Sequence, residues 1–143
     1  MSNPSDHSVL TPMKVKVLSD DSGFVEALAS MRPDPTTDAE QQLAICHGEP
    51  RFVPGAMGSW WEIVLALGVV SIPARVAATL ISNRMWQAYL KSKSDQQQSR
   101  QTTKARLIFR NDSCSFEFQI ESWDHEAIRS CVEAALIHVN RKS

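Results

Sequence analysis

PGAMGSWWEIVLALGVVSIPARVAATLISNRMWQAYL, residues 54–90, is the most apolar segment of this chain, and its burial has to be explained first. It contains three of the four Trp residues and an uncharged run from Ile63 to Ala74. A helix that is apolar on every side does not remain in water. The segment must therefore be covered by the chain's own domain, by further copies of the chain, or by a membrane.

Turn and breaker residues divide this segment. Pro54, Gly55 and Gly58 predict a turn-rich loop at its start. Pro73 predicts a break, because proline lacks a backbone donor and clashes with the preceding helical turn. We therefore expect a long, Pro-interrupted hydrophobic pair of helices, or one kinked helix, within residues 58–91.

A membrane-spanning helix is the alternative for the same segment. A span needs about 20 predominantly apolar residues, and the uncharged run is shorter than that. The run becomes long enough only if Arg75 lies inside it, where a charge is costly and usually functional. Burial in protein, including self-association, is therefore the primary expectation, and contact with lipid is the alternative.

Length and charge limit what the rest of the chain can be. The 143 residues correspond to one domain with one core. The formal net charge of −1 argues against nucleic-acid binding. Three Cys residues without a CxxC pair indicate neither a zinc site nor a disulfide framework. Residues 1–12 lack a secretory signal pattern, so we expect a flexible arm there and a cytoplasmic protein.

Periodicity outside the central segment predicts a small α+β domain over residues 13–143. Apolar residues alternate in three short segments, which predicts strands, and recur at helical spacing near the C-terminus. The expected order is β-α-β, two central helices, then β-β-α, with the helices on one face of the sheet. The expected elements are strands at 13–18, 42–47, 105–110 and 114–121, helices at 23–31 and 124–140, and a polar linker at 92–103.

Sequence motifs for catalysis are absent from the chain. It has no GxSxG, HExxH, Gly-rich phosphate loop or paired Cys/His cluster, so we expect no catalytic residues, no metal and no cofactor. Cys46 and His47 are neighbours on an expected strand and would point to opposite faces. Asp124 and Glu126 are explained by capping of the last helix.

The chain resembles the effector-associated constant component family, first class, of bacterial conflict systems. The resemblance rests on PGAMG at residues 54–58 before an apolar stretch interrupted near Gly68, on a following helix that ends after Leu90, and on DHEAIRSCVEAAL at the end. It implies a small non-enzymatic protein, encoded beside variable effectors, proteases and nucleotide-dependent switch proteins that defend bacteria against phage by abortive infection. The acidic middle of the chain and the paired Trp60 and Trp61 depart from the family pattern.

Two functional hypotheses follow. The first is a non-catalytic adaptor that forms homo-oligomers and binds an operon-encoded effector, protease or switch protein through the central helices. The second is a pore-forming cell-death effector that a partner such as a protease releases to the inner membrane. Both assign assembly or membrane contact to Met57, Trp60, Trp61, Ile63, Leu67, Gly68, Arg75, Leu80 and Trp86, and hinge positions to Pro54, Gly55, Gly58 and Pro73.

Gly68 and Arg75 carry a specific expectation within the first hypothesis. A glycine within a helix costs about 1 kcal/mol against alanine, so close approach of a neighbouring helix would explain Gly68. Arg75 would then lie on the same face, where it would need an acidic partner such as Glu62.

Overall fold

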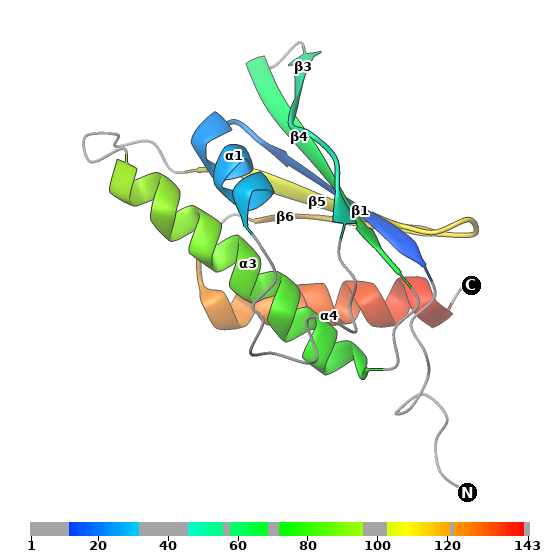
Figure 1. Ribbon diagram of the computed structural model, residues 1–143. Coiled ribbons are helices and arrows are strands. Elements are labelled where there is room, and N and C mark those ends of the chain that lie inside the picture. Colours follow the sequence, from blue (N-terminus) through cyan, green and yellow to red (C-terminus); the bar gives the residue numbers. More distant parts are fainter. Residues whose placement is uncertain are drawn as a thin grey trace, which may run out of the picture.

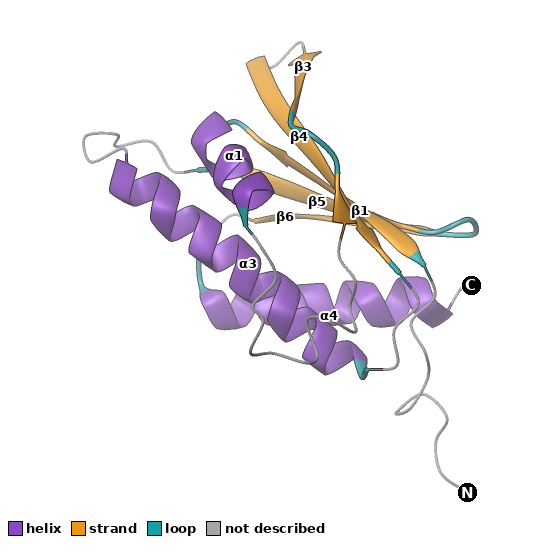
Figure 2. Ribbon diagram, in the orientation of Figure 1, coloured by secondary structure: helices purple, strands orange, loops and turns teal. Residues whose placement is uncertain are grey.

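The computed structural model describes residues 12–31, 46–55, 58–68, 72–95, 103–120 and 122–141. It is an α+β arrangement with an antiparallel sheet on one side and helices on the other (Figures 1 and 2). The elements in chain order are β1 (Met13–Ser19), α1 (Ser22–Ser30), β2 (Cys46–His47), β3 (Arg51–Gly55), β4 (Gly58–Leu67), α3 (Ala74–Asp95), β5 (Ala105–Arg110), β6 (Ser115–Ile120) and α4 (His125–Arg141).

The expected pair of hydrophobic helices is not confirmed, because the first ten residues of the segment, Gly58–Leu67, form strand β4. Burial alternates along this strand: Ile63, Leu65 and Leu67 are buried, whereas Val64 and Ala66 are half-buried. Aromatic and β-branched residues favour such a pleated surface. The prediction was wrong because the outward face is also largely apolar, which hides the period of two.

Helix α3 forms the second half of the segment, and Pro73 precedes it rather than interrupting it. The carbonyl of Pro73 accepts hydrogen bonds from the amides of Val76 (3.0 Å) and Ala77 (3.1 Å) in the first turn. The helix continues to Asp95, so the first four residues of the expected linker at 92–103 are helical. Residues 96–102, and residues 1–11 of the expected arm, lie outside the described residues.

Six described strands occupy five positions in the sheet, in the order β2-β4-β1-β5-β6, with β3 also paired to β4. Strands β2 and β3 lie one after the other along the same edge of β4. His47 pairs with Leu65 and Arg51 with Glu62, so residues 48–50 oppose only residues 63–64. This is a β-bulge, which bends an edge strand and interrupts its ladder.

The core lies between the sheet and the helices. The buried side chains of β4 align with those of β1 and β5; Leu65, for example, pairs with Val15, which pairs with Phe109. Helix α1 packs on β1 and β4, helix α4 packs on β5 and β6, and α3 packs against both α1 and α4. The strands expected at 13–18, 105–110 and 114–121 correspond to β1, β5 and β6, and the helices expected at 23–31 and 124–140 correspond to α1 and α4; residue 121 lies outside the described residues. Of the strand expected at 42–47, only Cys46 and His47 are described.

Asp21 joins three parts of this core. Its Oδ1 caps α1 by accepting hydrogen bonds from the amides of Gly23 (2.9 Å) and Phe24 (3.3 Å). Its Oδ2 accepts from the hydroxyls of Ser92 on α3 (2.6 Å) and of Thr103 before β5 (2.9 Å). Burial raises the pKa of the Asp21 carboxyl, but the hydrogen bonds from Ser92, Thr103 and the two amides outweigh it and lower that pKa below its usual value.

Candidate protein-binding surface

The hairpin formed by β3 and β4 extends beyond the rest of the sheet (Figure 1). Strand β1 pairs with β4 only as far as Trp61, which lies opposite Ser19, whereas β3 pairs with β4 as far as Gly58. The end of the hairpin is therefore a two-stranded ribbon. Such ribbons have little stability in water without a further surface to pack on.

Aromatic side chains gather on this hairpin. Phe52 is 49% exposed and makes an edge-to-face contact with Trp61, with ring centroids 5.5 Å apart. Trp61 is half-buried against the core, and strand alternation places Trp60, also half-buried, on the opposite face. Val53 lies beside Trp60 in the pairing. We call Phe52, Val53, Trp60 and Trp61 the aromatic hairpin; it presents apolar surface on both faces of the ribbon.

The sheet face opposite the helices continues from this hairpin, and no described helix covers it. Its apolar centre is Leu18, Val64 and Ile108, all half-buried, and in the pairing Lys16 lies between Val64 and Ile108. We call this surface the open face. Its residues are Lys14, Lys16, Leu18, Arg51, Val53, Trp60, Glu62, Val64, Ala66, Arg106, Ile108, Arg110, Ser115, Glu117 and Gln119.

The open face is predominantly basic. It carries five Lys or Arg residues against two Glu. Lys16 lies 3.9 Å from Glu62, and Arg106 lies 3.3 Å from Glu117. An open depression of about 730 Å³ lies at one end of this face, and its charged lining residues are Lys14, Lys16, Glu62, Arg110 and Asp112. The face therefore suits a partner surface that combines apolar and acidic groups.

The structure brings together the expected contact and hinge residues of the hairpin. Pro54 and Gly55 end β3, and Gly58 begins β4, next to Trp60 and Trp61. Met57 lies outside the described residues.

The other expected contact residues do not join the hairpin. Ile63 and Leu67 are buried in the chain's own core, and Leu80 is half-buried against it. Trp86 is half-buried and stacks on His125, with ring centroids 5.4 Å apart. Gly68 follows the end of β4 and does not lie within a helix, so the cost of a glycine in a helix does not apply to it.

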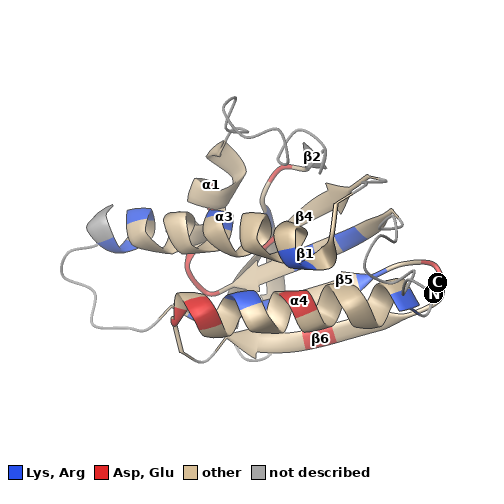
Figure 3. Cartoon of the chain, turned by 90° about the horizontal axis from the view of Figure 1, so that it is seen from below, with Lys and Arg blue, Asp and Glu red and all other residues tan. Residues whose placement is uncertain are grey.

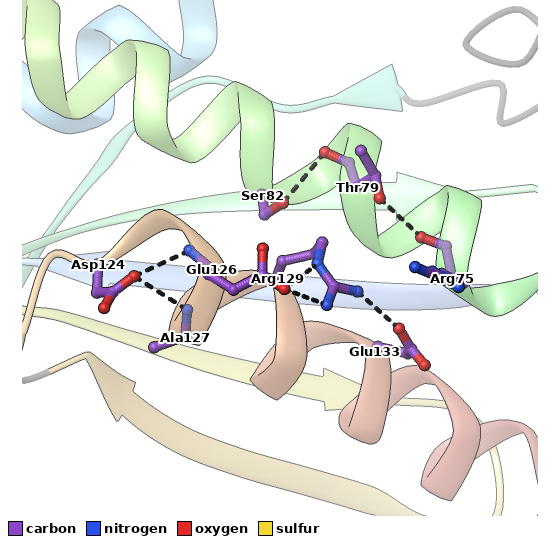
Figure 4. Close-up of polar contacts among 8 residues, drawn as sticks. All are labelled: Arg75, Thr79, Ser82, Asp124, Glu126, Ala127, Arg129 and Glu133. Carbon is purple, nitrogen blue, oxygen red and sulfur yellow. Dashed lines mark hydrogen bonds and ion pairs between the residues drawn. The ribbon is translucent and has the colours of Figure 1, made fainter.

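Arg75 is also not a buried charge in an apolar helix. It is exposed in the first turn of α3, and Glu62 is paired with Lys16 instead. Figure 4 shows Arg75 across from α4, where Arg129 bridges Glu126 and Glu133. The hydrogen bond from Arg129 lowers the pKa of the exposed Glu126, with smaller contributions from nearby charges that include Arg75. Exposed pairs of this kind contribute little to stability.

Sequence reasoning missed Phe52, Val53 and the open face. The Pro and Gly residues around positions 48–58 indicated a loop and hid a strand. A signal was present: Pro54, Gly55 and Gly58 lie between the apolar pairs Phe52-Val53 and Trp60-Trp61, and turn residues between two apolar segments also fit a β-hairpin. The open face could not be recognised while β4 was taken as a helix.

Two properties of the described residues bear on other functions. None of the helices in that part of the chain is both long and apolar enough to cross a membrane. Likewise, within the described ranges, no group of three or more His, Cys, Asp or Glu residues is placed to hold a metal ion.

Comparisons of the chain with protein-family models, with curated proteins and with solved structures find no match.

Proposed function

We propose that this protein is a non-catalytic adaptor of a bacterial anti-phage defence system, and that it binds a protein partner through the aromatic hairpin and the adjoining open face. The observation that carries this proposal is the overhang of the hairpin with Phe52 about half exposed on it. Aromatic residues in such positions often dominate the energy of protein–protein contacts. The defence role comes from the family resemblance, and three residues of its most specific motif belong to the same hairpin: Pro54 and Gly55 end β3, and Gly58 begins β4.

The partner we propose is an effector, a protease or a nucleotide-dependent switch protein encoded beside this chain. The charge of the open face adds a requirement, because its excess of cations favours an acidic partner surface. Binding should therefore weaken as salt concentration rises.

Substitution of the hairpin aromatics tests this proposal. We expect Phe52→Ser and Trp60→Ser each to weaken binding to the cognate neighbour protein by about tenfold or more. Each substitution removes an aromatic contact with the partner, and the loss of about 1.4 kcal/mol of binding free energy raises the dissociation constant tenfold. Binding would be measured by calorimetry with each purified neighbour protein, and phage protection would be measured in cells that carry the intact operon.

Leu90→Ser is the matched control, because Leu90 is an apolar residue that is 45% exposed on α3, outside the aromatic hairpin and the open face. It should leave binding unchanged, and circular dichroism should show that all three variants are folded. If both serine variants bind and protect like the original protein, or if no neighbour protein binds, the proposal is wrong.

The pore-forming alternative loses the feature that motivated it. The apolar segment was to be released as a helix, but its first part is strand β4, which pairs with β1 on one edge and with β2 and β3 on the other. Extraction of β4 would expose the core residues Ile63 and Leu65 and separate β1 from β3. Leakage of liposomes with this protein would be needed to restore that hypothesis.

A further inference from the structure

The two edges of the sheet differ in how they are protected against pairing with another strand. The β2–β3 edge contains a bulge and two prolines, Pro50 and Pro54. Bulges and prolines are devices that blunt an exposed edge. Strand β6 at the other edge, SFEFQI, has neither bulge nor proline, and its single charge at Glu117 is paired with Arg106 of its own sheet.

Hydrogen-bond alternation shows which backbone groups of β6 face outward. The amide of Asn111 donates to the carbonyl of Cys114 at the start of the β5–β6 ladder. Bonded and non-bonded pairs alternate along an antiparallel ladder. It follows that Phe116, Phe118 and Ile120 bond to β5, whereas the N–H and C=O groups of Ser115, Glu117 and Gln119 point away from the sheet. Consistent with this, the Ser115 carbonyl accepts a weak contact from the Cys114 thiol, at 3.7 Å.

A second copy of β6 is complementary to this edge. Two antiparallel copies related by a twofold axis through Phe118 would place Phe118 opposite Phe118 and Phe116 opposite Ile120 on the helix side of the sheet. Glu117 would lie opposite Gln119, and the outward backbone groups of these two residues would bond to each other. The neighbouring register, centred on Glu117, would place two like charges opposite each other, which is destabilising.

Helix α4 has a matching surface beside this edge. It runs along β6 in two perpendicular views (Figures 1 and 3). The ring of His138 on α4 contacts the ring of Phe116 on β6, with centroids 5.2 Å apart. Four exposed residues lie on this side of α4 at intervals of four, three and four positions. Most of them are small, and none is Lys, Arg, Asp or Glu. They are Ala127, Cys131, Ala134 and His138.

The twofold axis through Phe118 also fits the centre of this stripe. Phe116 on β6 contacts His138 on α4. Phe118 lies two residues, about 7 Å, further along the strand, and the same distance along the helix is four to five residues, so Phe118 lies near Ala134. Pairing of the edge strands would bring the two α4 helices side by side at a separation of about 10 Å, where small residues are needed at the contact.

We propose that the protein forms a twofold-symmetric homodimer in which β6 pairs with β6 of a second copy in the register centred on Phe118, with the α4 helices packed together beneath the joined sheets. The dimer leaves the aromatic hairpin free at both far edges. It is therefore independent of the adaptor role proposed above.

Sedimentation of the full chain at micromolar concentrations tests this dimer. We expect Gln119→Pro to raise the dimer dissociation constant at least about tenfold, because it removes an outward donor that β5 does not use. Gln119→Ala keeps the backbone donor and should remain dimeric.

Substitutions on α4 provide a second test that does not alter the strand. Ala134→Glu should also produce monomers, whereas the control Ile137→Glu, which is exposed on a neighbouring side of the same helix, should remain dimeric. A short bismaleimide should link two copies of the original protein through Cys131, and Cys131→Ser should abolish the link. A monomeric original protein, or a dimer that survives in folded Gln119→Pro and Ala134→Glu variants, would overturn the proposal.

Discussion

Leu65→Asp is expected to abolish folding, whereas Val64→Asp, one residue away, is expected to leave the protein folded. Leu65 is 1% exposed in the core, and an ionised carboxylate there would cost several kcal/mol in addition to the lost packing of the leucine. The total stability of a domain is only about 5–15 kcal/mol. Val64 is half-buried on the open face directly opposite Lys16, so a carboxylate there gains a cationic neighbour.

Circular dichroism and urea unfolding of the two variants would measure this contrast. Ala66→Asp extends it, because Ala66 shares the open face with Val64 in a strand but would share an apolar face with Ile63 and Val70 in a helix. We expect Ala66→Asp to be folded. Equal losses at positions 64, 65 and 66 would contradict the strand assignment of β4.

Asp21→Ala is expected to lower the free energy of unfolding by about 3 kcal/mol. The loss of the α1 cap accounts for about 1 kcal/mol. The rest arises because the hydroxyls of Ser92 and Thr103, whose residues are only 2% and 4% exposed, lose their common acceptor, and an unsatisfied buried group costs about 1–3 kcal/mol. Urea unfolding at neutral pH would measure this loss, with Asp20→Ala as the control that leaves the shared acceptor in place.

The same carboxylate predicts a pH dependence. The pKa of Asp21 is lowered in the folded protein, so its contribution to stability is fully present above the unfolded-state pKa of about 3.9 and is lost as pH falls through the folded-state pKa. The original protein should therefore lose more stability than Asp21→Asn when the pH is lowered from 5 to about 3. If the free energies of unfolding of the two proteins fall equally as the pH is lowered, Asp21 is not the group whose protonation destabilises the protein.

The sequence by itself determined the elements in which polar and apolar residues separate cleanly. Strand β1 alternates Lys14 and Lys16 with buried Val15 and Val17, and α4 has one apolar stripe, so each pattern has a single interpretation. The β5–β6 hairpin was recognisable for the same reason. In these elements water contacts one side only, and the period of the buried residues reports the local backbone structure.

Only the tertiary structure decided the state of residues 58–67 and the location of the candidate surface. Both faces of β4 are largely apolar, one because it lies in the core and the other because it contributes Trp60 and Val64 to the open face. With no polar side, a strand and a helix have the same local pattern. The choice is made by partners that are distant in the sequence. Strands β1 and β3 supply hydrogen-bonding partners for β4, and Asp21 joins α1 to Ser92 and Thr103, which lie 71 and 82 positions further along the chain.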